Sequence, residues 1–419
     1  MDDRRLDRDA IKRVNRNLVL NLVKSAGPLS RRDIVRRSGL SPATVTNLTA
    51  ELIAEDLVHE MGPGEATRGR PPVLLRLNNR AGFVVGVKVM EEALAAVVTD
   101  LDAEVLAYRS DPLPTPDRNA GSQGIKPAEV VAAVADIVEL VLGEARVDRS
   151  TVLGVGLGLA GVMDSHAGKV VFSPFFSWKD VDLAGPLKRR LGMNVILEND
   201  VNALTIAEQW FGHGHDREHF CVVTVGTGVG LGLVLNGQFY RGVGGGAGEL
   251  GHTTLVEDGP TCYCGKKGCL EMLASDRAVI RKAGPAMTDR TPGEEKLTLA
   301  NLVAAADRGV VAARELLAES GHWLGIGIAN LVNLVNPGLV IIGGEGVHAG
   351  EWRFGPMRQA FAAHVFDGLA DQTEFVIEPA GDDTWARGAA CVVLGEMFKS
   401  PLHKTRGPDL SASSVRVKA

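Results

Sequence analysis

The sequence predicts an α/β protein with a small helical head and a larger body of two lobes. Two observations over the 419 residues carry this prediction. The first eighty residues show helical periodicity with capping residues, whereas from residue 82 apolar strand-like runs alternate with helices. The charge changes at the same place, because residues 1–80 carry 15 Lys and Arg against 10 Asp and Glu, and the rest carry 30 against 41. A basic head on an acidic body indicates that the head binds a polyanion.

The composition is that of an ordinary globular protein, with 45% hydrophobic and 23% charged residues. No stretch reaches the roughly 18 uninterrupted apolar residues of a membrane helix, and the start MDDRRLDRDA lacks the apolar core of a signal peptide. We therefore expect a cytoplasmic protein without a membrane partner. Thiols stay reduced in that compartment, so a tight group of cysteines favours a metal site over a disulfide.

Three helices are expected in the head. The first covers about 11–26 and ends at Gly27-Pro28, with an apolar stripe that we expect to face inward, formed by Ile11, Val14, Leu18 and Leu22. The second begins at Ser30, where SRRD has the N-cap serine and the acidic residue three positions later of a capping box. The third begins with Ser41 as cap and Pro42 at the first helical position.

The third helix has a polar start. Its inward positions are Val45, Leu48, Leu52 and Ile53, which leaves Thr44, Thr46 and Asn47 exposed. Two short helices joined by a glycine-containing turn are typical of a helix-turn-helix, whose second helix reads base edges. Two strand-like runs then flank the tip Arg68-Gly69-Arg70-Pro71, which predicts a wing suited to a narrow minor groove.

The sequence thus predicts a DNA-binding head, with candidate contacts at Arg31, Ser41, Thr44, Thr46, Asn47, Arg68 and Arg70. The alternative is a solvated basic surface on a small helical interaction domain. The order of helix, turn, capped helix and arginine-tipped wing favours double-stranded DNA as the partner.

The body contains two series of strands with glycine-rich turns and covering helices. The first series includes FVVGVKV, LAAVVTDL and TVLGVGLGLAG, and the second includes HFCVVTVGTGVGLGLVLNG and LVIIGG. This repetition predicts an α/β body of two lobes with a cleft between them, and ligands of such bodies bind at the strand ends.

Six motifs of the body, in order, resemble the signatures of the ROK family of repressors, open reading frames and sugar kinases. They are GLGLAGVMD, LENDVNALTIAEQWFG, VGTGVGLG, GGGAGELGH, CYCGKKGCLE and NPGLVIIGGEGV. With the winged helix in front, the whole chain resembles the transcriptional repressors of this family. The resemblance implies an actin-like, ribonuclease H-like body with a first lobe at 82–200, a second lobe at 201–383 and a returning helix at 384–399. The winged head covers 1–80, and the lack of apolar periodicity at 400–419 predicts a flexible tail.

The stretch TCYCGKKGCLE holds three of the five cysteines. Together with an upstream histidine they supply one imidazole and three thiolates, a closed set for one structural zinc ion per chain. The resemblance implies that the ligands are His252, Cys262, Cys264 and Cys269. A redox switch formed by Cys262 and Cys264 is the alternative.

The resemblance also implies a sugar site, because sugar hydroxyls need several carboxylate and amide partners. The implied sugar-binding residues are Gly161, Asn199, Asp200, Glu249, His252 and Glu271. Asp200 holds the general-base position of the family's kinases. An Asx turn that caps the following helix is the other interpretation of Asp200.

The phosphate motif DxGGT of the kinases is replaced here by Lys88-Val89-Met90-Glu91-Glu92. Side chains fill the place of the glycines, and two carboxylates oppose phosphate by about 1 kcal/mol each in water at 4 Å and about 4 kcal/mol at an effective dielectric of 20. We therefore expect loss of kinase activity and no catalytic residue.

The expected function is a sugar-responsive regulator, a repressor of carbohydrate uptake or catabolism genes, which acts as a homodimer or homotetramer on a pseudo-palindromic operator. The partners are operator DNA and a small sugar effector. The alternatives are an ATP-dependent sugar kinase with a DNA-binding head, and a regulator that responds to a sugar phosphate or to a protein.

Overall fold

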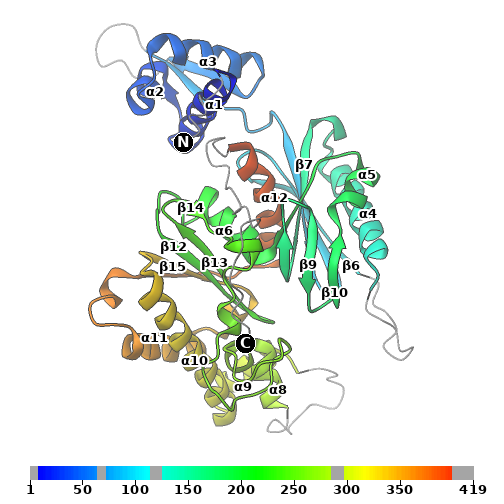
Figure 1. The fold of residues 1–419 in the computed structure, drawn as a ribbon, viewed down its shortest axis with the longest axis vertical. Helices are drawn as coiled ribbons and strands as arrows, with labels where there is room; N and C mark the ends of the chain where they lie inside the picture. The colour runs from blue at the N-terminus through cyan, green and yellow to red at the C-terminus, as the bar shows by residue number, and fades with distance from the viewer. Residues whose placement is uncertain (1–7, 64–71, 114–124, 285–296, 399–419) are drawn as a thin grey trace, which may run out of the picture. The chain divides into compact units, whose positions relative to one another are not determined.

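The structure, a computed structural model, describes residues 8–63, 72–113, 125–284 and 297–398. These residues form two compact units (Figure 1). The first runs to Phe83 and includes Asp100–Asp102 and the chain from Leu394, and the second comprises Val84–Thr99 and Ala103–Val393. The predicted tail at 400–419 lies outside the described residues.

The first unit contains the helix-turn-helix and the two strands of the predicted wing. Its helices are α1 (Arg8–Ser25), α2 (Arg31–Ser38) and α3 (Pro42–Ala54). Its sheet has the order β1-β3-β2, with β1 (Leu29–Ser30), β2 (Val58–Pro63) and β3 (Val73–Leu77). Strands β2 and β3 are antiparallel. The wing tip with Arg68 and Arg70 lies outside the described residues.

The predicted starts of α2 and α3 are confirmed by their caps. The Ser30 hydroxyl accepts a hydrogen bond from the Asp33 backbone N–H at 3.1 Å and donates to the Asp33 carboxylate at 2.6 Å. The Ser41 hydroxyl accepts from the Thr44 N–H at 3.1 Å. Gly39 ends α2 with a φ of 71°, in the left-handed region that glycine adopts without strain. These caps fix the turn that joins the two helices.

The predicted inward face of α1 is wrong. Ile11 and Leu18 are 44% and 37% exposed, whereas Val19, Leu20 and Val23 are at most 1% exposed. The segment LVLNLV carries apolar residues on adjacent faces, and tertiary packing selects the second of them.

The body contains two five-stranded sheets with the same connectivity. The first has the order β11-β7-β4-β5-β6, and the second has the order β14-β13-β12-β15-β16. In each sheet the first strand along the chain is central, the next two extend it to one edge, and the last two extend it to the other. The first sheet comprises β4 (Phe83–Val89), β5 (Ala93–Thr99), β6 (Val105–Pro112), β7 (Val152–Leu159) and β11 (Val195–Asn199).

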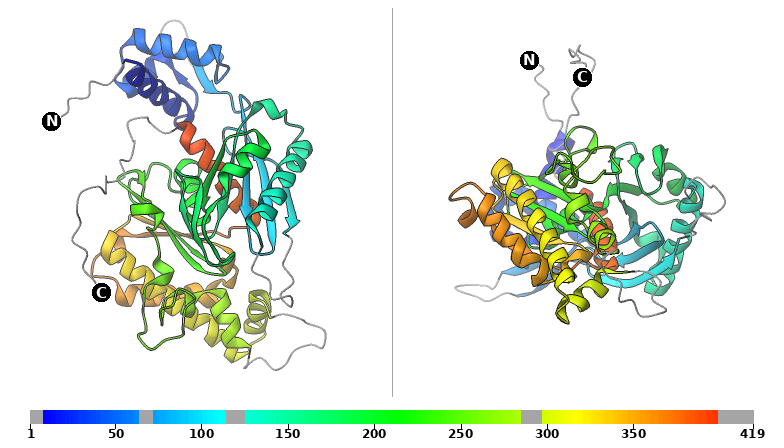
Figure 2. Two further views of the ribbon diagram at one scale, coloured as in Figure 1. Left: turned by 45° about the vertical axis from the view of Figure 1, so that its right-hand side comes forward. Right: turned by 90° about the horizontal axis from the view of Figure 1, so that it is seen from below.

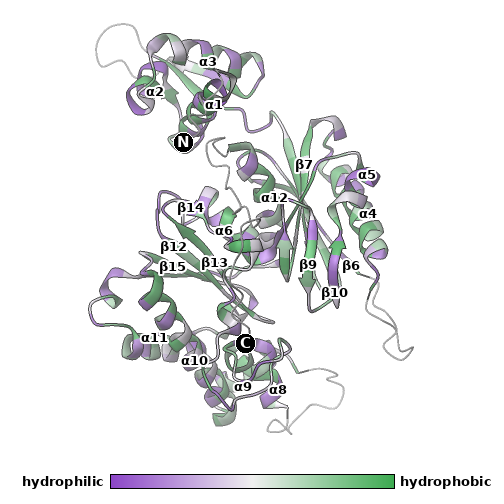
Figure 3. Cartoon of the chain, in the orientation of Figure 1, coloured by the Kyte–Doolittle hydropathy of each residue, from purple (hydrophilic) through white to green (hydrophobic). Residues whose placement is uncertain are grey.

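The second sheet comprises β12 (Phe220–Val225), β13 (Val229–Leu235), β14 (Gln238–Phe239), β15 (Leu339–Gly343) and β16 (Glu374–Ile377). A small antiparallel sheet extends the first lobe and comprises β8 (Val162–Asp164), β9 (Lys169–Ser173) and β10 (Trp178–Asp182). Apolar residues concentrate on the strands of both large sheets (Figure 3).

Helices cover the sheets of each lobe. Those of the first lobe are α4 (Pro127–Ala145) and α5 (Ala184–Leu191), and those of the second are α7 (Glu271–Ala274), α8 (Asp276–Ala283), α9 (Leu299–Asp307), α10 (Val311–Val335) and α11 (Glu351–His364). Side chains of α10 and α11 share a core with β12, β13 and β15. No helix in the described part of the chain has the length and hydropathy needed to cross a membrane.

Two helices, α6 (Asp200–Phe211) and α12 (Asp382–Phe398), pack on the other face of the second sheet. Leu204 of α6 and Trp385 of α12 share a core with Phe220 and Val222 of β12. The helix α12 also contacts the first sheet, so it lies between the lobes (Figure 2).

Glycines make this second contact possible. A Cβ at Gly86 would lie 2.0 Å from the Ala386 carbonyl oxygen, and a Cβ at Gly156 would lie 1.8 Å from the Ala389 carbonyl oxygen. Both clashes are with helix backbone, which cannot yield without moving α12.

The substitution Gly156→Ala should therefore lower the free energy of unfolding by about 3 kcal/mol or more. Gly143→Ala in α4 is the matched control, because a Cβ there meets nothing within 4 Å, and alanine favours a helix by roughly 0.5–1 kcal/mol. Urea unfolding measures both. Equal midpoints for the two variants would show that α12 does not pack on β7 in this way.

Candidate functional site

A cavity of about 1190 Å³ opens between the two lobes. All six residues that the sequence assigns to the sugar site line it: Gly161, Asn199, Asp200, Glu249, His252 and Glu271. They come from the end of β7, the junction of β11 and α6, the 3₁₀ turn η4 (Leu250–His252) and its flank, and the start of α7. Residues up to 110 positions apart thus share one space.

Asn199 and Gly161 form one wall of this cavity. The Asn199 side-chain amide donates to the Gly161 carbonyl at 2.9 Å, and its oxygen accepts from the Asn202 N–H at 3.1 Å, which caps α6. Gly161 has a φ of 132°, and a Cβ there would lie 2.3 Å from the Phe172 carbonyl oxygen. Asn199 is thus the cap of α6, and the neighbouring Asp200 is left with a different partner.

That partner is Lys88. The Lys88 ammonium on β4 donates to Asp200 Oδ2, and the two side chains are only 10% and 12% exposed. The same ammonium lies 4.6 Å from the ring centroid of Trp385 on α12. The sequence marks Lys88 only as a departure from the phosphate motif, because nothing local reveals a contact across 112 positions.

Glu271 also lines the cavity, at the start of α7. Its carboxylate accepts from the Val229 N–H at 3.1 Å, and a Cβ at Gly228 would lie 2.7 Å from Glu271 Oε2. The glycine-rich turn between β12 and β13 therefore packs directly on this carboxylate. Burial raises the pKa of Glu271, because a charged carboxylate loses its hydration there.

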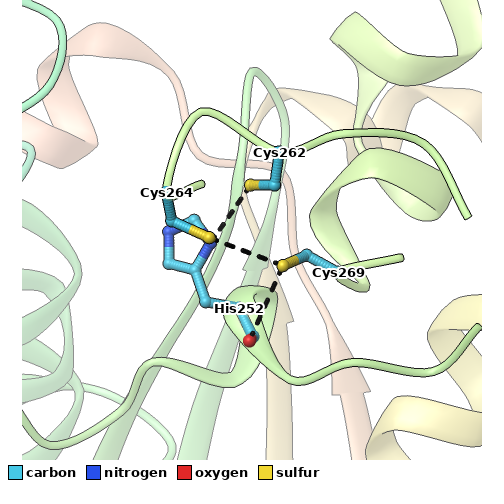
Figure 4. A group of neighbouring side chains, drawn as sticks. All are labelled: His252, Cys262, Cys264 and Cys269. Carbon is cyan, nitrogen blue, oxygen red and sulfur yellow. Dashed lines mark hydrogen bonds between the residues drawn. The ribbon is translucent and has the colours of Figure 1, made fainter. Parts of the chain in front are cut away.

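The four predicted metal ligands form one cluster (Figure 4). The Cys262 sulfur lies 3.5 Å from His252 Nδ1, the Cys264 and Cys269 sulfurs are 3.6 Å apart, and all four ligand atoms lie within 4.8 Å of one another. A tetrahedral zinc ion with ordinary bond lengths needs sulfur–sulfur separations of about 3.8 Å and sulfur–nitrogen separations of about 3.6 Å. The donor set fits zinc, and all four positions are protein ligands.

The histidine of this cluster links the metal site to the cavity. Its Nδ1 faces Cys262, whereas its Nε2 lies 3.0 Å from the Tyr263 hydroxyl, which also lines the cavity. Burial lowers the pKa of His252, which favours the neutral imidazole that a metal binds. Tyr263 is not among the predicted site residues, because a lone tyrosine between two cysteines carries no local sign of a cavity.

A buried ion pair that the sequence analysis did not predict, Glu198 with Arg241, lies beside Asn199 and supports it. Glu198 is 1% exposed and accepts from the Asn199 N–H and the Asn202 side chain, both at 3.0 Å. Arg241 donates to the other Glu198 oxygen at 2.8 Å. Glu198 stands inside the apolar strand NVILEND, and a carboxylate buried there needs polar partners. The sequence therefore did contain a local sign of this pair.

The predicted DNA-contacting residues of the helix-turn-helix lie at the starts of α2 and α3. Thr46 and Asn47 are exposed on α3, where the Thr46 hydroxyl donates to the Pro42 carbonyl at 2.8 Å. The Ser41 and Thr44 hydroxyls are 2.8 Å apart. Thr46 and Asn47 thus present their side chains to solvent at the start of the helix that the sequence assigns to base reading.

Arg31 has a role within the head that the sequence did not reveal. Its Nε donates to the Thr49 hydroxyl at 3.1 Å, and its guanidinium pairs with Glu60 at 2.9 Å. It therefore links α2 to α3 and β2, and its assignment as a DNA contact remains a prediction.

Residues 84–396 match the profile described as the ROK family. The chain belongs to the ROK family. It is 30% identical over 398 residues to the xylose repressor of Caldicellulosiruptor bescii, which covers 93% of this chain and 98% of the relative. Head and body are both included in this match.

Two solved structures of ROK proteins show how much of the chain is structurally similar to a regulator and to a kinase of the family. A ROK family transcriptional regulator, a homologue of the Escherichia coli MLC protein, superposes with a TM-score of 0.79 at 28% identity and covers 93% of this chain and 97% of its own. A ROK family glucokinase from Streptomyces griseus, in complex with glucose and AMPPNP, gives 0.62 at 28% identity and covers 74% and 99%. The kinase thus matches most of the chain, and the regulator matches nearly all of it.

Proposed function

We propose that this ROK protein is a sugar-responsive transcriptional repressor that binds operator DNA through its N-terminal head. The observation that carries the proposal is the combination of a winged helix-turn-helix with a body whose cavity collects six candidate sugar ligands. Full-length similarity to a xylose repressor and to a ROK regulator supports it. Repression of carbohydrate uptake or catabolism genes is the role that accounts for both the DNA-binding head and the sugar cavity of the body.

The sugar would contact Asn199 and Asp200 at the start of α6 together with Glu249 and Glu271, all of which line the cavity. Carboxylates accept strong hydrogen bonds from hydroxyl groups, and an amide both donates and accepts. A zinc ion held by His252 and the three cysteines would fix the loop that carries Glu249, while His252 Nε2 faces the cavity. Such a closed zinc site supplies stability to the loop and no reactive position.

The same proposal assigns no kinase activity to the chain. Lys88 stands in the segment that replaces the phosphate motif and pairs with Asp200, the general-base position of the kinases. A carboxylate in this pair can still accept a bond from a sugar hydroxyl. The rival, a sugar kinase with a DNA-binding head, predicts ADP release from ATP and sugar, which our proposal does not.

Sugar binding would release the operator by favouring one arrangement of the lobes over another. A ligand shifts such an equilibrium only by its difference in affinity for the two states. Two copies on a pseudo-palindromic operator would place their recognition helices about one helical turn apart. The resulting assembly is a homodimer or a homotetramer.

Glu249→Ala tests the sugar site. The affinity for D-xylose, D-glucose or N-acetyl-D-glucosamine, whichever binds the wild-type protein in calorimetry, should fall roughly 10- to 100-fold, since a hydrogen bond to a charged group contributes about 1.5–3 kcal/mol. Glu257→Ala is the matched control, because Glu257 is exposed on the same loop and does not line the cavity. Unaltered affinity in Glu249→Ala would remove Glu249 from the site.

A further inference from the structure

Lys88 is held at the wall of the cavity by groups from three different elements. It pairs with Asp200 at the start of α6, lies over the Trp385 ring of α12 and interacts electrostatically with Glu345, which follows β15. The Trp385 indole N–H in turn donates to Glu345 Oε1 at 3.1 Å. These partners hold the ammonium beside Asp200 at the wall of the cavity.

Its main partner is fixed as well. Asp200 Oδ2 accepts from Lys88, and Asp200 Oδ1 accepts from the Val201 backbone N–H at 2.9 Å. A carboxylate has about four acceptor positions, so two of them remain after these bonds. Both Lys88 and Asp200 line the cavity, which gives the remaining positions access to a ligand.

A nearly buried ion pair is costly unless each charge keeps good partners, and removal of one partner leaves the other uncompensated. Asp200 would therefore lose its fixed orientation if Lys88 were absent, because only the bond from the Val201 N–H would then hold it, and a carboxylate that turns is a poorer acceptor for a ligand. Lys88, which stands in the replaced phosphate motif, thus has a structural role: it keeps the Asp200 carboxylate oriented.

We propose that Lys88 is a positioning residue for the sugar effector, which acts by holding the Asp200 carboxylate as a fixed, charged acceptor for a sugar hydroxyl. This inference rests on the proposed function and deepens it. The substituted motif has then gained a role in sensing, in addition to the loss of phosphate binding.

The test compares wild-type protein with Lys88→Met, Asp200→Asn and the double variant. Each protein is bound to a labelled operator fragment, and the concentration of D-xylose, D-glucose or N-acetyl-D-glucosamine that releases half of the DNA is measured. Each single variant should raise that concentration about tenfold or more. The double variant should match Asp200→Asn within twofold, because Lys88 acts only through Asp200.

Two further variants separate positioning from general damage. Lys88→Arg keeps the charge and should recover part of the response, even if Lys88→Met fails to fold. Lys282→Met is the matched control, since Lys282 pairs with Glu319 on the surface and does not line the cavity.

The outcomes distinguish the two proposals. If no sugar of the panel releases the wild-type protein, the proposed function fails and the role of Lys88 fails with it. If the wild type responds and Lys88→Met responds at the same concentration, or if the losses in the two single variants multiply in the double variant, only the role of Lys88 is wrong.

Discussion

Cys269→Ser should abolish both metal binding and the response to sugar. The purified wild-type protein is expected to contain about one zinc per chain by elemental analysis, and the variant well below that. Apparent binding free energies of structural zinc in small peptides are about 10–16 kcal/mol, so the loop from Glu249 to Glu271 should lose several kcal/mol of local stability. With Glu249 and Glu271 no longer held, operator release by sugar should disappear, whereas the separate helix-turn-helix should still bind DNA.

Cys221→Ala provides the control for this experiment. Cys221 is a fully buried thiol of β12 that shares a core with Leu324 and Val340. Its removal should lower stability by cavity formation and leave the zinc content at about one. Wild-type protein that holds no metal and instead forms a reversible Cys262–Cys264 disulfide would favour the redox switch.

Asn47→Ala should weaken operator binding by about 1–3 kcal/mol, or roughly 5- to 150-fold, if the amide contacts a base edge. The variant should also lose discrimination at one operator position, because a base contact specifies sequence and a phosphate contact does not. Anisotropy on the operator and on a set of single-base variants, at one salt concentration, measures both effects.

Asn79→Ala is the companion variant, because it removes the same amide group from the turn after β3, outside the start of α3. Its operator affinity should stay within about twofold of wild type. Equal losses in the two variants would mean that the start of α3 does not read bases, and would favour the basic interaction surface over DNA recognition.

Local signals in the sequence were sufficient for the starts of α2 and α3 and for the group of three cysteines, whereas His252 followed from the family motif. The caps at Ser30 and Ser41 depend on residues three positions away, and the cysteines lie within eight positions of one another. The buried face of α1 could not be predicted in this way. Leu18 and Val19 are adjacent and equally apolar, and only packing against the rest of the head decides which one is buried.

In the cavity, too, some features could be predicted from sequence motifs and others depend on tertiary packing. Its six candidate residues follow from motifs, whereas the pair of Lys88 with Asp200 and the support of Glu198 by Arg241 connect distant parts of the chain. The strand order of the two sheets brings these residues together. No local sequence pattern predicts contacts between residues so far apart in the chain. A charged residue in a buried strand, such as Glu198, is the one local sign that a distant partner exists.

We propose that a sugar in the cavity of the body releases the head from DNA. The most direct test is fluorescence anisotropy of the full-length protein on a labelled fragment from upstream of its own gene, titrated with D-xylose, D-glucose and N-acetyl-D-glucosamine at fixed salt. We expect tight binding without sugar and a loss of affinity with one sugar of the panel. Tight binding that no free sugar alters would contradict the claim and direct attention to sugar phosphates or a protein partner.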